Sequence, residues 1–208
     1  MTSLLKSIYL LPLLAFTLSL ENPLPKKAED IQPLLTGEVF PKAQVQDLSG
    51  KVLDLQALIK QKPTVLIVYR GGWCPYCNTQ LAGTGAILPF LQEMGYQVLA
   101  LSPDSPEKLR AEAEDKRSAY TLLSDPQLEA AEALGIIFEM PAETAERYAS
   151  RGLHLPRLER YQAYALPVPT VLVLDQEGVI QFEYINPNYK VRLQPELLLK
   201  AAELALKP

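Results

Sequence analysis

Apolar and polar stretches alternate along the chain in a way that predicts strands separated by helices. Residues 64–69 form a continuous apolar run, rich in β-branched side chains, which is typical of a strand buried on both faces, and residues 96–101 predict a second buried strand. A helix is predicted after each run, over residues 75–93 and, beyond a Ser-Pro start signal, over residues 107–115. This alternation indicates an α/β fold with a partly parallel sheet.

Shorter elements complete the pattern on both sides. Residues 45–48 and 51–54 predict two strands around the Ser49-Gly50 turn, and residues 55–61 predict a short helix that Pro63 ends. Further along, the pattern predicts a strand over 121–123, a helix from Asp125-Pro126 to Gly135, a β-hairpin of 170–174 and 179–184, and a terminal helix from Gln194 or Pro195 to Leu206.

Residues 139–166 fit neither a strand nor a helix template. This segment carries four arginines and three tyrosines: Arg147, Arg151, Arg157, Arg160, Tyr148, Tyr161 and Tyr164. We interpret it as a solvated insertion with a helical turn or two, and the alternative is a lid or partner-docking arm near the functional site.

The first thirty residues differ in composition from the rest. Lys6 precedes an almost entirely apolar stretch over residues 8–20, with Thr17 and Ser19 near its end, which is typical of a secretory signal. The alternatives are an N-terminal helix of the fold and an uncut anchor that gives weak membrane association. We therefore expect a signal peptide or anchor over 1–20, a linker over 21–30 and a domain over 31–208, exported to a bacterial periplasm or the extracellular space.

Composition excludes several classes of protein. The 208 residues are 48% hydrophobic and 21% charged, which is ordinary for a globular domain. A formal net charge of −4 argues against a nucleic-acid partner, and two cysteines are too few for a disulfide-stapled scaffold. No run of about 18 apolar residues is present, so an ordinary membrane-spanning helix is not expected.

Both cysteines lie in one pentapeptide, Trp73-Cys74-Pro75-Tyr76-Cys77, between a buried strand and a helix. Unpaired backbone N–H groups and the positive end of the helix dipole favour a thiolate there, most of all at Cys74. Arg70 adds positive charge nearby in sequence. The two intervening residues allow the sulfurs to close a disulfide, so the motif predicts a redox-active pair.

Three other interpretations of the cysteines receive less support. A structural zinc site needs four protein ligands, whereas the chain offers two thiols and one histidine, His154, so no metal is expected. A pair of inert buried cysteines does not explain their position at a strand–helix junction. A cysteine–histidine hydrolase is not favoured either, because His154 lies in the insertion and is interpreted as a surface or packing residue.

Three stretches carry a family resemblance: residues 68–77 (VYRGGWCPYC), 166–170 (LPVPT) and 173–178 (VLDQEG). They resemble the peroxiredoxin-like redoxins of the alkyl hydroperoxide reductase/thiol-specific antioxidant superfamily, over about residues 41–206. The resemblance implies a thioredoxin-like fold, with a central mixed sheet flanked by helices, an N-terminal extension and an insertion before the strand that follows a cis-proline. It makes Pro169 that cis-proline and places Trp73, Tyr76 and Thr170 at the substrate.

The sequence departs from the peroxiredoxin pattern at three points. Such sites carry Pro and then Thr or Ser seven and three residues before the reactive cysteine, where this chain has Ile67 and Gly71. The distant arginine of the site has no secure counterpart, and Arg151 is the candidate. The Cys-Pro-Tyr-Cys tetrapeptide itself resembles that of glutaredoxins, and the preceding Trp73 resembles thioredoxins.

Two enzymatic hypotheses follow. In the first, the chain is a thiol peroxidase: Cys74 becomes a sulfenic acid, Cys77 resolves it to a disulfide, and a thioredoxin-type reductant restores the dithiol, with no cofactor. In the alternative, Cys74 attacks disulfides of other proteins and Cys77 releases the mixed disulfide. A third, non-enzymatic hypothesis is a binding module that uses the dithiol as a sensor or clip.

Overall fold

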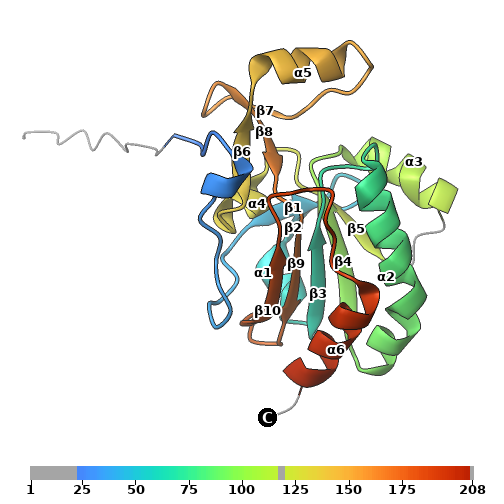
Figure 1. The fold of residues 1–208 in the computed structure, drawn as a ribbon. Coiled ribbons are helices and arrows are strands. Elements are labelled where there is room, and N and C mark those ends of the chain that lie inside the picture. Colours follow the sequence, from blue (N-terminus) through green and yellow to red (C-terminus); the bar gives the residue numbers. More distant parts are fainter. Residues whose placement is uncertain (1–22, 117–119, 207–208) are drawn as a thin grey trace, which may run out of the picture.

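The computed structural model describes residues 23–116 and 120–206, and the expected signal segment over 1–20 lies outside these ranges. A seven-stranded mixed sheet runs in the order β10-β9-β3-β4-β5-β1-β2 through the middle of the molecule (Figure 1). Its strands are β1 (Gln44–Gln46), β2 (Val52–Asp54), β3 (Thr64–Val68), β4 (Gln97–Ser102), β5 (Thr121–Ser124), β9 (Thr170–Leu174) and β10 (Ile180–Ile185).

Strand β3 lies at the centre of this sheet. It pairs in parallel with β4 and antiparallel with β9, and all five of its residues are buried. Successive side chains point to opposite faces: Leu66 and Val68 join one core cluster, whereas Val65 and Ile67 join the other. The prediction of a strand buried on both faces is confirmed.

Helices cover both faces of the large sheet (Figure 1). One face packs against α2 (Pro75–Glu93), α3 (Pro106–Lys116) and α6 (Pro195–Ala205), and the other against α1 (Leu55–Ile59) and α4 (Glu129–Ala133). Gly83 and Gly85 lower the helix propensity of α2, but a Cβ there would lie 3.0 Å from Pro195 Cγ and 2.9 Å from the Tyr120 hydroxyl, respectively. The two glycines therefore allow α2 to pack closely against its neighbours.

The helix expected from Asp125 to Gly135 is shorter than predicted. Leu128 takes a left-handed conformation with φ of 55°, so α4 begins only at Glu129. The Asp125 carboxylate is buried and accepts a hydrogen bond from the Ala131 N–H at 3.0 Å. Burial raises the pKa of Asp125 to about 6.

The segment expected to be a solvated insertion with a helical turn or two does contain a short helix, but it also forms a second, small sheet that the sequence did not predict. It consists of β6 (Ile137–Met140), β8 (Ala163–Pro167) and β7 (Arg157–Leu158) in that order, with α5 (Ala142–Ala149) between β6 and β7. This unit has its own small hydrophobic core, formed by the buried side chains of Met140, Ala145, Leu155 and Leu166. The pattern was missed because each strand is short and its pairing partner is distant in sequence.

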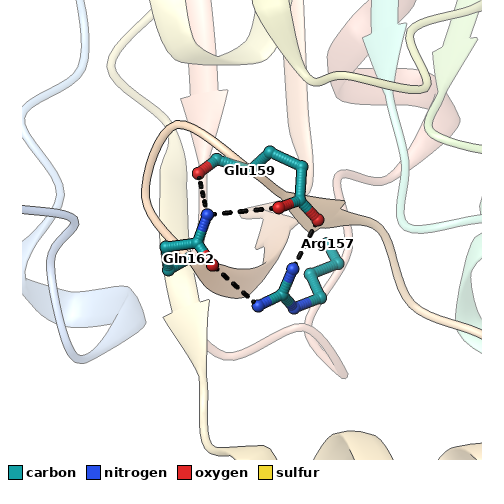
Figure 2. A network of polar contacts seen from close by, with 3 residues as sticks. All are labelled: Arg157, Glu159 and Gln162. Atoms are coloured by element: carbon teal, nitrogen blue, oxygen red, sulfur yellow. Dashed lines mark hydrogen bonds and ion pairs between the residues drawn. The ribbon is translucent and has the colours of Figure 1, made fainter.

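The arginines of this segment stabilise turns and edges of the small sheet. Figure 2 shows Arg157 paired with Glu159 and donating to Gln162 Oε1 at 3.0 Å across the β7–β8 turn, where Gln162 has a left-handed φ of 51°. Arg160 pairs with Glu132 beside α4. Arg157 and Arg160 therefore stabilise the folded structure through these contacts.

Residues 23–30 are not the free linker that the sequence predicted. Leu24 is buried in the core, and the Pro25 carbonyl accepts a hydrogen bond from the Glu139 N–H of β6 at 2.8 Å. A short 3₁₀ helix, η1 (Ala28–Asp30), follows. Among the helices of the described ranges, none is long and apolar enough to cross a membrane.

Candidate active site

The cysteine motif lies where β3 leaves the large sheet and the chain reverses into α2. Tyr69 continues the strand by donating its N–H to the Leu101 carbonyl at 2.9 Å. Gly71 then makes the turn with φ of 137°, a region that side chains rarely adopt, and a Cβ there would lie 2.4 Å from Trp73 Nε1. The turn therefore requires glycine, and it delivers Cys74 to the N-cap of the helix.

Two polar side chains hold this turn in place. The Asp104 carboxylate accepts a hydrogen bond from the Gly72 N–H at 2.8 Å, and the Asn78 amide donates to the Gly72 carbonyl at 2.9 Å. The turn is thus tied both to the segment after β4 and to the first turns of α2, which fixes the direction in which the cysteines face.

Cys74 is the N-cap of α2, and Cys77 lies in its first turn. Both are free thiols, and the residues are 1% and 0% exposed. A hydrogen bond from the Cys77 thiol, aided by the Cys77 N–H and by the charges of Arg70 and Arg192, lowers the pKa of Cys74 to about 5. The same hydrogen bond, together with burial, raises the pKa of Cys77. The pair therefore favours the thiolate on Cys74 and the neutral thiol on Cys77.

Arg192 is a functional residue that the sequence analysis missed. It lies in the loop between β10 and α6, and its Nη2 atom approaches Cys77 Sγ at 3.4 Å and Cys74 Sγ at 4.0 Å. Its Nη1 atom donates to Gln80 Oε1 on α2 at 3.0 Å, which orients the guanidinium. Arg151, the arginine that the sequence suggested for this role, is instead exposed after α5, and the two sulfurs contact Arg192.

Arg70 lies at the site as predicted and is held by aromatic rings. Its guanidinium carbon lies 4.3 Å from the centre of the Tyr189 ring and 5.1 Å from that of Trp73. Trp73 in turn contacts Tyr148 of α5, with ring centres 5.6 Å apart. Tyr76 contacts Tyr189 and is 38% exposed, so it lies at the mouth of the site.

The prediction of a cis-proline at Pro169 was wrong, because no cis peptide bond occurs within the described ranges. Residues 168–169 carry the chain from β8 of the small sheet to β9 of the large sheet. Val168 donates its N–H to the Ile136 carbonyl at 2.8 Å, and the Thr170 hydroxyl donates to the Val168 carbonyl at 3.0 Å. The Val168–Pro169 bond is trans, the form that X–Pro bonds favour by about 0.5–1 kcal/mol. Thr170 is buried and its hydroxyl is used within the chain.

Comparison with known proteins places the chain in a family. The AhpC/TSA family matches residues 36–183, and the chain belongs to it. Peroxiredoxin Bcp of Escherichia coli K12 is 32% identical over 106 residues, which cover 51% of this chain and 67% of that protein. Peroxiredoxin bcp1 of Schizosaccharomyces pombe is 30% identical over 112 residues, which cover 53% and 57% of the two chains.

Solved structures share the fold. Reduced Prx3 from Vibrio vulnificus superposes with a TM-score of 0.66 at 17% identity, covering 82% of this chain and 99% of that one. Peroxidoxin BcpB from Mycobacterium tuberculosis gives a TM-score of 0.64 at 19% identity, covering 83% and 98%. The thioredoxin-like fold is confirmed, and membership of the family makes the chain an oxidoreductase of the thiol peroxidase class.

The origin of the Cys74 thiolate leads to a first prediction. Replacing Cys77 by Ala removes the thiol that donates to Cys74, so we expect the pKa of Cys74 to rise from about 5 toward the ordinary thiol value near 8.5. Cys77→Ser keeps a donor and is the matched control, for which a smaller rise is expected. The measurement is the pH dependence of thiolate absorbance and of alkylation by iodoacetamide. Identical titration curves for the Ala and Ser variants would contradict this account.

Proposed function

We propose that this protein reduces peroxides through a Cys74 sulfenic acid that Cys77 resolves to an intramolecular disulfide. The observation that carries the proposal is the arrangement of two buried sulfurs at the start of α2, with the Arg192 guanidinium within 4.0 Å of both. The names of the relatives, peroxiredoxins of bacteria and yeast, support the same reaction.

The reaction proceeds in two balanced steps. The Cys74 thiolate attacks the terminal oxygen of the hydroperoxide, the O–O bond breaks, and the leaving alkoxide takes up a proton to become an alcohol. Cys74 then carries a sulfenic acid. The Cys77 sulfur attacks the Cys74 sulfur, the S–O bond breaks, and water leaves as the disulfide forms. A dithiol of the thioredoxin type then returns two electrons by thiol–disulfide exchange.

Two donors near Cys77 are suited to a peroxide oxygen. The Tyr69 hydroxyl and Arg192 Nε are both buried, and Arg192 Nε has no hydrogen-bond partner among the described residues. A buried donor without a partner costs roughly 1–3 kcal/mol, and an oxygen-bearing ligand would recover part of it. Tyr69 interacts electrostatically with Cys77, and Arg192 contacts its sulfur. These donors offer a substitute for the Thr or Ser hydroxyl that the chain lacks at Gly71.

Reduction of protein disulfides is the second candidate function. Tyr76 and Val191 are exposed apolar residues beside the site, and such residues suit a protein partner. Cys74 itself is only 1% exposed, however, and a protein disulfide has to reach the attacking sulfur directly. This burial favours a small substrate such as a peroxide, with the apolar residues contacting the reductant.

The roles of the two cysteines can be separated with single variants. We expect the wild type to consume hydrogen peroxide or an organic hydroperoxide with thioredoxin and thioredoxin reductase, and Cys74→Ser to give only background consumption. Cys77→Ser should complete one turnover and retain a sulfenic acid that dimedone labels, because no resolving thiol remains. Reduction of insulin disulfides is measured on the same protein preparations. Turnover of insulin without turnover of any peroxide would overturn the proposal in favour of the second candidate.

Arg192 gives a further prediction. Arg192→Met removes the guanidinium beside both sulfurs, so we expect the rate of peroxide reduction to fall about 10- to 100-fold. Arg192→Lys keeps the positive charge, so its rate of peroxide reduction should lie between those of the wild type and Arg192→Met. Gln80→Met, which removes only the acceptor of Arg192 Nη1, is the control for altered packing and should have the smaller effect. The readout is the second-order rate of Cys74 oxidation, and equal rates for Gln80→Met and Arg192→Met would show that the charge has no role.

The proposal extends to the location of the protein. The basic start and the apolar stretch over residues 8–20 support export, with removal of a signal peptide before the folded domain. Expression of the full chain in a bacterial host, followed by N-terminal sequencing of the mature product, tests this. We expect a new N-terminus shortly after residue 19, and an intact Met1 in the cytoplasmic fraction would contradict it.

A further inference from the structure

A pocket lies against Arg70 on the side of the small sheet, and neither cysteine lines it. It has a volume of about 330 Å³, at the lower end of the range for small-molecule sites. The small sheet, η1 and the loop after β10 enclose it. Its walls are mainly apolar and include Phe138, Met140, Tyr148, Pro169, Pro187 and Tyr189.

Arg70 supplies the charge of this pocket. The residue lines the pocket, is only 5% exposed, and lies against the rings of Trp73 and Tyr189. Within the described ranges no carboxylate forms an ion pair with Arg70. The other charged lining residues, Lys27 and Glu29, are exposed and of opposite sign, so the net charge facing the pocket is that of Arg70.

We propose that this pocket binds a small organic anion that consists of a carboxylate on an apolar body. The carboxylate would pair with the Arg70 guanidinium, which offers planar, charge-assisted hydrogen bonds and has no other anionic side chain to pair with. The apolar body would lie against the aromatic and proline walls. A buried guanidinium without an acidic partner is costly, and such a ligand offsets that cost.

Arg70 also couples the pocket to the redox state of the cysteines, a step that rests on the proposed function. The positive charge of Arg70 favours the Cys74 thiolate, so a carboxylate in the pocket and the thiolate compete for the same charge. Formation of the Cys74–Cys77 disulfide removes the thiolate. Linkage then requires the anion to bind more tightly to the disulfide form than to the reduced form.

The binding experiment compares 4-phenylbutyrate with 4-phenylbutan-1-ol, which differ in the carboxylate. Trp73 is the sole tryptophan of the chain and contacts both Arg70 and Tyr148, so its fluorescence reports on the pocket, with calorimetry as a second readout. We expect saturable binding of the acid, at least about ten-fold tighter than that of the alcohol, and a further gain of about five-fold in the disulfide form. Equal affinities for acid and alcohol, or no binding of either, would overturn the proposal.

Variants test where the ligand binds. Ala28→Phe fills the pocket from η1 and should abolish binding, whereas Ala57→Phe on the exposed side of α1 is the matched control and should leave it unchanged. Arg70→Met should remove the preference for the acid, and Arg70→Lys should retain part of it. Unchanged binding in Ala28→Phe would refute the site. Because the titrations contain no peroxide, a protein that bound the acid but failed the peroxidase assay would refute only the proposed function.

Discussion

The hydrogen bond from the Cys77 thiol to the Cys74 sulfur is the interaction on which the chemistry of this molecule depends. It divides two chemically equivalent thiols into an anion and its proton donor. The bond forms because Cys74 is held at the N-cap of α2 while Cys77 lies in the first turn. That position in turn depends on β3, whose burial between β4 and β9 fixes where the chain leaves the sheet.

Most of the large sheet could be predicted from sequence because its signals are local. An unbroken apolar run identifies β3, and the helix expected over residues 75–93 is found with the same bounds. The position of the cysteine pair followed from these two elements alone. The small sheet was not predicted because β6 and β8 are short strands. They pair with each other although α5 and β7 lie between them in the sequence, so no local pattern identifies them.

The residues that surround the two cysteines were harder to predict from the sequence than the cysteines themselves. Arg192 is separated from Cys74 by more than half the chain and stands in a loop without a motif, so only the packing of α6 against α2 reveals it. Arg151 was chosen by family analogy and proved exposed. Pro169 was likewise assigned as a cis-proline by analogy, and its peptide bond is trans. Long-range contacts therefore set the electrostatics of the site, whereas local sequence sets only its location.

The contact between Arg192 and the two sulfurs also has a consequence for biosynthesis. Translation produces the cysteines first, and the guanidinium that contacts them follows more than a hundred residues later. A ribosome-bound chain can therefore expose both thiols before β9, β10 and the segment carrying Arg192 exist. Full nucleophilic strength arises only when the C-terminal quarter docks, so that reactivity is acquired together with the folded state.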